Sequence, residues 1–223
     1  MKLLIFDTET TGLPKSRKSF DESGPGNWPH IVSISWVIYD AEHDCIEKQR
    51  RYIITPMGWE IPEEVVRIHG IDTQKAKIQG HPLKDVLSEF MAEPVQALVA
   101  HNMEFDYNVV CSAVKYDLEM DFKGFPQKRY CTMELSRNIC NLKTLFGKPK
   151  SPKLSELYEY VFKKQPIPSS LHDSLYDTII LTEVVQHCHE LRLKMNLPSL
   201  EKESSKNANS ANGSKVLSLD LRK

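Results

Sequence analysis

Four carboxylates lie on segments whose other residues are mainly apolar. Asp7 and Glu9 follow the apolar run 3–6, and their spacing of two places both side chains on one side of a β-strand. Asp106 and Asp177 each fall on the apolar stripe of an expected helix. A buried ionised carboxylate is strongly unfavourable when alone, and these stripes carry no cations to pair with it. The sequence therefore predicts that a bound divalent cation compensates these charges.

Oxygen ligands without a cysteine or a histidine pair favour Mg²⁺ or Mn²⁺ over zinc. A cluster of four acids can hold two such ions about 3.5–4 Å apart, an arrangement that activates a water and stabilises the leaving oxygen in phosphodiester cleavage. The chemistry also needs a base. His172, five residues before Asp177, is the candidate, because an imidazole can be neutral and basic near neutral pH.

Each feature has a structural alternative when it is taken alone. The first two acids could simply end a strand, and His101 could be a buried histidine with satisfied hydrogen bonds. Asn102 could cap its helix. Asp173 could cap the last helix and leave His172 on the surface. Three motifs in this order, each at the start or end of an element, favour chemistry over these alternatives.

Together the motifs resemble those of the DEDDh exonucleases, in the style of the proofreading (epsilon) subunits of DNA polymerase III. They are IFDTETTGL at residues 5–13, HNMEFD at 101–106 and HDSLYD at 172–177, and RIHGID at 67–72 is similar to a turn of the same group. The resemblance covers about residues 1–192. It implies a ribonuclease H-like fold and 3′→5′ hydrolysis of nucleic acid to nucleoside monophosphates.

The resemblance also implies a role for each residue of the motifs. Asp7, Glu9 and Asp177 would ligate the catalytic ion. Asp7 would also bridge to a second ion near Asp106, and His172 would be the general base. The positions expected around the 3′-terminal nucleotide are Thr8, Thr10, Gly12, Leu13, His101, Asn102 and Phe105.

Two positions depart from the family's pattern. Ser174 stands two residues after His172, where many relatives have a small apolar residue. Ser33 stands in the second strand, where glutamine is frequent. Neither position is catalytic, so the departures bear on substrate recognition rather than on activity.

The elements that must position these residues follow from the pattern of apolar residues. Strands are expected at residues 2–6, 31–39, 46–55, 97–100 and 129–131, and helices from 62, 73 and 82 and at 103–115, 153–163 and 173–192. A polar stretch rich in lysine and proline is expected after the last strand. An antiparallel group followed by alternating strands and helices predicts an α/β fold with a mixed central sheet flanked by helices.

Length and composition fit one domain with a tail. The 223 residues are 40% hydrophobic and 26% charged, with no apolar run of ~18 residues that could span a membrane. The exonuclease domain is expected over residues 1–198 and a flexible Ser/Asn/Lys-rich tail over 199–223. The N-terminal apolar stretch is too short for a signal peptide, so the cytoplasm is the expected compartment. The five cysteines are expected to be reduced thiols. The sequence His187-Cys188-His189 is expected to be a buried cysteine between two surface histidines on a helix rather than a metal site.

The overall charge does not indicate a binding partner. The formal net charge is −1, so the chain as a whole lacks the excess of basic residues that is typical of nucleic-acid-binding proteins. The cationic loop 14–30 could hold a strand by phosphate contacts and stacking, or be a solvated insertion anchored by Trp28. The basic stretch 143–153 leaves the same two alternatives open. Residues 217–221 (LSLDL) resemble the peptides that dock on the bacterial sliding clamp, but the glutamine that leads those peptides is absent here. The alternatives are an apolar terminus or an edge strand.

The sequence thus supports two classes of function. The first is a two-metal 3′→5′ exonuclease acting on DNA, at single-stranded or frayed 3′ ends in proofreading or repair, with RNA or oligoribonucleotides as the alternative substrate. The second is a catalytically weak, exonuclease-like binding module that a polymerase or clamp recruits through the tail. All five catalytic positions of the family's pattern are present, which favours the enzyme.

Overall fold

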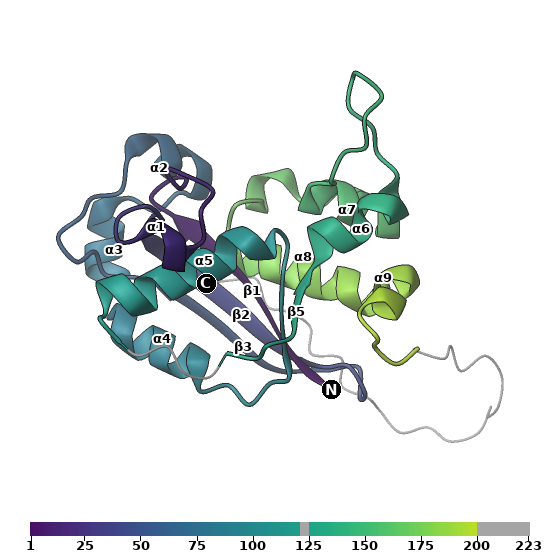
Figure 1. Cartoon of the computed structure of the whole chain (residues 1–223), viewed down its shortest axis with the longest axis horizontal. Helices are drawn as coiled ribbons and strands as arrows, with labels where there is room; N and C mark the ends of the chain where they lie inside the picture. The colour runs from purple at the N-terminus through teal and green to yellow at the C-terminus, as the bar shows by residue number, and fades with distance from the viewer. Residues whose placement is uncertain (121–124, 200–223) are drawn as a thin grey trace.

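A five-stranded sheet forms the centre of the structure, a computed structural model that describes residues 1–120 and 125–199 (Figure 1). The strands are β1 (Lys2–Thr10), β2 (Ile31–Asp40), β3 (Cys45–Ile53), β4 (Ala97–Ala100) and β5 (Arg129–Cys131). Their order is β3-β2-β1-β4-β5. The first three are antiparallel neighbours, whereas β1, β4 and β5 run parallel. The predicted mixed sheet is confirmed.

Helices cover both faces of this sheet (Figure 1). They are α1 (Phe20–Ser23), α2 (Glu63–His69), α3 (Thr73–Gln79), α4 (Leu83–Met91), α5 (Met103–Ser112), α6 (Thr132–Cys140), α7 (Leu154–Phe162), α8 (Ser174–His187) and α9 (His189–Lys194). A π-helical segment (Ala113–Asp117) continues α5, and a 3₁₀ turn (Pro168–Ser170) precedes α8. Apolar side chains of α4 and α5 form the core on one face, and those of α7, α8 and α9 form it on the other.

β1 divides its side chains between the two cores. Leu4 and Phe6 pack on the face of α4 and α5, and Leu3 and Ile5 pack on the face of α8. Because side chains alternate along a strand, Asp7 and Glu9 continue the row that faces α8. β1 extends to Thr10 rather than ending at residue 6, since its pairing with β2 continues to that residue. The acidic motif therefore lies on regular strand and not on a loop.

The helix α6 was not predicted, because residues 132–140 fall after the last expected strand, where the sequence indicates only a polar stretch rich in lysine and proline. Two of its buried residues are polar, Thr132 and Ser136, and the Ser136 hydroxyl donates to the Thr132 carbonyl at 2.6 Å. Leu135 and Ile139 pack beside them against the core. A buried face that is half polar gives no clear apolar period, which explains the missed helix.

The last predicted helix is two helices, α8 and α9, separated at Cys188. The backbone there is extended, with φ −86° and ψ 98°. Cys188 is buried and its neighbours His187 and His189 are exposed, as expected for a structural cysteine.

The start of α8 is fastened to the sheet by buried hydroxyl groups. Ser174 Oγ lies 2.8 Å from Ser35 Oγ and 3.1 Å from Ser33 Oγ, and the Thr178 hydroxyl donates to the Ser174 carbonyl at 2.7 Å. All four side chains are buried. The two positions that depart from the family's pattern thus contact each other. This serine cluster fixes the helix end that carries Asp177.

Two further expectations from the sequence concern membrane-spanning segments and the C-terminal tail. None of the helices in the described part of the chain has the length and apolar character needed to cross a bilayer. Residues 200–223, with the clamp-like motif 217–221, lie outside the described residues.

Candidate active site

The four predicted acids converge at the carboxyl end of β1. Burial raises the pKa of Asp7 well above its ordinary range, and the charges of Asp106, Glu9 and Asp177 raise it further. Such charge effects require that the three other carboxylates lie close to Asp7. The structure therefore brings together acids from β1, α5 and α8, which are far apart in the sequence.

The other three carboxyl groups show the same tendency. Burial, followed by the charges of Asp177 and Asp106, raises the pKa of Glu9 to about 9. Burial raises the pKa of Asp106 to about 7, against the opposing hydrogen bonds from Thr8. Burial likewise raises the pKa of Asp177 to about 7. Because every shift favours the neutral acid, the cluster is unfavourable as four free anions and strongly favours a bound cation.

Asp106 is held in place by Thr8. The Thr8 N–H donates to Asp106 Oδ1 at 3.1 Å, and the Thr8 hydroxyl donates to the same oxygen at 2.7 Å. Asp106 is 3% exposed and Thr8 is 7% exposed. The Thr8 hydroxyl is thus used inside the protein to orient a carboxylate, and the expected place of Thr8 beneath the terminal nucleotide stays a prediction.

The loop before α8 positions His172 beside Asp177. The Asp173 side chain caps α8 by accepting from the N–H groups of Leu175 (3.0 Å) and Tyr176 (3.3 Å). His172 has a left-handed backbone, with φ 65°, and its N–H donates to Asp177 Oδ2 at 3.1 Å. The helix cap predicted for Asp173 is present, and the His172 side chain is exposed. The two features coexist, because the cap directs the loop toward the acids.

Arg51 of β3 adds a link that the sequence did not reveal. Its guanidinium donates to Asp173 Oδ2, which joins the loop before α8 to the sheet. Asp173 also contributes a fifth negative charge that raises the pKa of Asp7, Glu9 and Asp177.

The donor atoms fit a divalent cation. Within residues 1–120 and 125–199, one group of potential ligands has its donor atoms within 4.8 Å of one another, namely Glu9, His172 and Asp177. Asp177 Oδ1 is buried and has no hydrogen-bond partner among the described residues. A buried carboxylate oxygen without a donor is unfavourable unless a cation lies against it. Hard oxygen donors suit Mg²⁺ or Mn²⁺, and Asp7 and Asp106 adjoin this group.

The end of β1 turns sharply into an exposed apolar side chain. The Thr10 hydroxyl donates to the Gly12 carbonyl at 2.8 Å, so it stabilises the turn. Gly12 has a φ of 150° and open space where a side chain would stand. Leu13 follows it and is 83% exposed. Exposure of a large apolar side chain beside an acidic cluster suits contact with the flat face of a base.

His69, in the predicted turn 67–72, lies against this end of β1. Its Nδ1 accepts the Ile71 N–H at 3.2 Å, so the neutral ring carries its proton on Nε2. Burial lowers the pKa of His69, and the backbone of Thr10 opposes that shift. The turn therefore braces the strand end that carries the acids.

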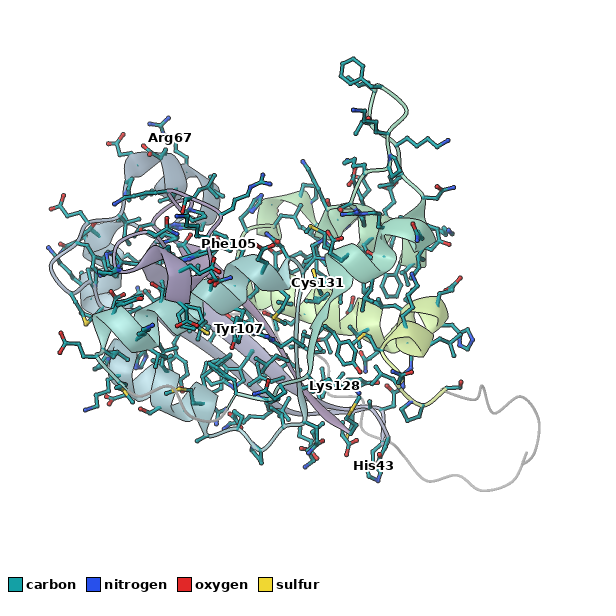
Figure 2. The ribbon with its side chains drawn as sticks, viewed as in Figure 1. His43, Arg67, Phe105, Tyr107, Lys128 and Cys131 are labelled. Atoms are coloured by element: carbon teal, nitrogen blue, oxygen red, sulfur yellow. The ribbon has the colours of Figure 1, made fainter. Side chains whose placement is uncertain are left out.

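A cleft of about 510 Å³ lies next to Leu13. Its walls include Leu13, Arg17, Asn102 and Phe105. Phe105 lies on α5 beside the N-terminal loop (Figure 2), where its ring meets Trp28 edge-to-face at 6.0 Å. The volume suits one nucleotide, whose base would contact the apolar walls.

Trp28 holds the cationic loop against the body of the protein. It is 7% exposed, and its indole N–H donates to the Lys18 carbonyl at 3.2 Å. Trp28 therefore anchors the loop, and both Trp28 and Arg17 line the cleft.

His101 and Asn102 behave differently from each other. His101 Nδ1 lies 3.0 Å from Thr132 Oγ1 and Nε2 lies 3.0 Å from the Pro152 carbonyl, so both ring nitrogens are engaged. Burial lowers the pKa of His101 to about 4. Asn102 precedes α5 with φ 87° and makes no side-chain cap bond. His101 thus shapes the site from within the protein, and Asn102 lines the cleft.

A mixed sheet of this order, with acids gathered at the carboxyl end of its first strand, defines the ribonuclease H-like class of α/β proteins. The family model described as exonuclease (RNase T) matches residues 4–185, and the chain belongs to that family. No curated protein matches the chain significantly.

Solved exonuclease structures share the fold at low sequence identity. E. coli exonuclease I in complex with a dA16 oligonucleotide has a TM-score of 0.64 and 16% identity, over 87% of this chain and 42% of that chain. The zinc-bound form of its complex with single-stranded DNA has a TM-score of 0.62 and 18% identity, over 87% and 42%. The nuclease domain of 3′hExo, a DEDDh family member bound to rAMP, has a TM-score of 0.62 and 14% identity, over 88% and 94%. The chain thus spans less than half of exonuclease I.

Proposed function

We propose that the protein is a divalent-metal-dependent 3′→5′ exonuclease that releases nucleoside 5′-monophosphates from DNA with single-stranded or frayed 3′ ends. The observation that carries the proposal is the cluster of four acids at the end of β1, all with raised pKa values. Membership of the exonuclease family supports the reaction type. The neighbouring cleft, whose walls are partly apolar and partly polar, supports a nucleotide as the group that is bound.

The role proposed for each residue follows from its place in the site. Asp7, Glu9, Asp106 and Asp177 hold Mg²⁺ or Mn²⁺, two ions per site. Such ions, when bound, supply an activated water and stabilise charge on the leaving oxygen. His172 accepts a proton from the attacking water, because its exposed ring lies at the edge of the acid cluster.

The substrate end is held by the opposite wall of the site. Leu13 and Phe105 contact the terminal base, and the amide of Asn102 offers hydrogen bonds to the sugar or phosphate. Thr8 acts through Asp106, and His101 acts through its neighbours. These assignments make the enzyme the preferred alternative to a catalytically weak binding module.

Oligonucleotides labelled at either end test the reaction and its direction. With Mg²⁺ or Mn²⁺ a 5′-labelled strand should shorten one nucleotide at a time, and a 3′-labelled strand should release labelled mononucleotide at once. Chelation should stop both reactions. Release of long fragments, or of mononucleotide from the 5′ end, would refute the proposal.

RNA is the second candidate substrate. The 3′hExo nuclease domain, whose length this chain matches closely, was solved with rAMP. Discrimination depends on whether the pocket accepts a 2′-hydroxyl. Rates on DNA and RNA strands of one sequence decide between them, and DNA is expected to be cleaved faster.

A role in proofreading or repair, with a polymerase or clamp as partner, rests on the sequence resemblance. It is tested by comparing a mismatched with a paired 3′ end, since an enzyme that needs a frayed end should cleave the mismatched end faster. Removal of residues 217–221 should leave cleavage of free oligonucleotides unchanged and abolish any binding to a clamp.

A further inference from the structure

Residues 141–153, here called the basic hairpin, join α6 to α7 and project from the body of the molecule (Figure 1). The segment contains four lysines and no acidic residue. Main-chain hydrogen bonds close its turn, from Thr144 N–H to the Lys148 carbonyl (2.8 Å) and from Gly147 N–H to the Thr144 carbonyl (2.9 Å). Gly147 has the positive φ, 74°, that turns of this kind require. The projection therefore has a defined backbone.

The tip of the basic hairpin is apolar. Leu145 and Phe146 are the two central residues of the turn, and they are 102% and 89% exposed. They therefore cover no part of the core. Together with Lys143, Lys148 and Lys150 they surround a hollow of about 580 Å³. An aromatic ring flanked by cations can stack on a base while the cations contact phosphates, which is how single-stranded nucleic acid is commonly bound.

Most lysines of the basic hairpin are free to meet a ligand. Lys150 pairs with Glu156 of α7 at 2.5 Å. Within the part of the chain that the structure describes, Lys143, Lys148 and Lys153 have no carboxylate at salt-bridge distance. An acidic partner therefore complements this segment, although the whole chain has a formal net charge of −1.

The base of the basic hairpin is tied to the active-site end of the sheet. The Pro152 carbonyl lies 3.0 Å from His101 Nε2, and His101 directly precedes Asn102 in the cleft. Arg137 of α6 donates to Ser151 Oγ at 2.9 and 3.0 Å. Since β1, β4 and β5 are parallel, their carboxyl ends share one edge, from which α5 and α6 both start. The hairpin thus rises from the edge that carries the acids.

We propose that the basic hairpin binds the strand on the 5′ side of the nucleotide held in the active site. Lys143 and Lys148 contact phosphates, and Phe146 stacks on a base. The inference rests on the proposed function, because it takes nucleic acid as the substrate. It predicts that the hairpin contributes to affinity for long strands and not to the reaction at the 3′ end.

Steady-state kinetics on a dinucleotide and on a strand of about 20 nucleotides test this, since only the long strand extends beyond the active site to stack on the hairpin. The double variant Lys143→Gln/Lys148→Gln should raise KM for the long strand roughly tenfold and reduce the slope of log KM against log salt by about 1.4, for two lost phosphate contacts. Phe146→Ala should raise this KM about fivefold or more. On the dinucleotide, both variants should match the parent protein.

Matched controls lie on α3 and α4, on the opposite side of the molecule (Figure 1). Lys77→Gln/Lys84→Gln removes two exposed lysines, and Ile78→Ala truncates an exposed apolar side chain. These controls should leave KM and its salt dependence unchanged. Equal KM values for hairpin variants and parent on the long strand would overturn the inference while leaving the proposed function intact.

Binding measured without catalysis separates the two proposals. Fluorescence anisotropy of the labelled long strand in chelator should show weaker binding by the Lys143→Gln/Lys148→Gln variant than by the control pair. If the parent protein binds the strand more tightly than the Lys143→Gln/Lys148→Gln variant but cleaves nothing, the proposed function fails while strand binding by the hairpin stands. If hairpin and control variants bind equally, the hairpin inference fails.

Discussion

Replacing Asp106 by asparagine tests how much the negative charges of the acid cluster destabilise the protein. The amide is almost isosteric with the carboxylate, and its oxygen can still accept both bonds from Thr8. The variant therefore removes a charge and leaves the packing in place. We expect Asp106→Asn to be inactive and, in the absence of metal, more stable than the parent protein at pH 8.

The magnitude follows from the raised pKa. Burial shifts the pKa of Asp106 from 3.8 to about 7. A raised native pKa means that stability is fully present below pH 3.8 and is lost as the pH rises through about 7. A shift of about 3 units corresponds to about 4 kcal/mol, and sharing of protons with the neighbouring acids reduces the effect to about 2–4 kcal/mol. For a chain of this size, that difference raises Tm by roughly 5–15 °C.

Thermal unfolding in chelator between pH 4 and pH 8 measures the effect. The Tm difference should be largest at pH 8 and should vanish toward pH 4. Millimolar Mg²⁺ or Mn²⁺ should raise the Tm of the parent protein and raise that of the variant less, because Glu9 and Asp177 remain as ligands. Asp85→Asn, which removes an exposed charge on α4, is the control and should change little. A variant no more stable than its parent at pH 8 would refute the electrostatic reasoning.

Three further predictions concern other parts of the site and the fold. His172→Ala should lower kcat by roughly 10²–10⁴-fold in steady-state cleavage assays, and an unchanged kcat would mean that another group is the base. Ser174→Ala should destabilise the protein by about 1–3 kcal/mol in denaturant unfolding, because it deprives the buried serine cluster of its shared partner, and an unchanged midpoint would contradict this. Although burial alone would raise it, hydrogen bonds from Arg50, Tyr52 and Lys48 lower the pKa of Glu89 to about 2. Glu89→Gln should therefore cost about 1 kcal/mol at neutral pH, a loss that closes as the pH falls from 4.5 to about 2.

The sequence predicts those features of the site that depend on local periodicity. The spacing of Asp7 and Glu9 fixes their common side of a strand, and Asp106 and Asp177 share stripes with residues that the structure buries. The order of strands and helices likewise predicts the mixed sheet. Each of these inferences uses neighbours within one element, where geometry is nearly fixed by backbone type.

Features that depend on contacts between distant elements could not be predicted. The bonds from Thr8 to Asp106 join residues 98 apart, and those of Ser174 to Ser33 join residues 141 apart. Taken singly, Ser33 and Ser174 each depart from the family's pattern. In the structure their hydroxyl groups lie 3.1 Å apart, so the two departures accommodate each other. The burial of Trp28 against Phe105 is of the same kind. The family resemblance supplied roles, but not these partners.

Direct titration with Mn²⁺ tests the central claim that the gathered acids form a metal site. Free Mn²⁺ can be followed by its electron paramagnetic resonance signal as protein is added, without any assay of cleavage. The parent protein should bind Mn²⁺, and Asp7→Asn and Asp177→Asn should lose that binding while keeping their circular dichroism spectra. Undiminished binding by both folded variants, or none by the parent protein, would contradict the account.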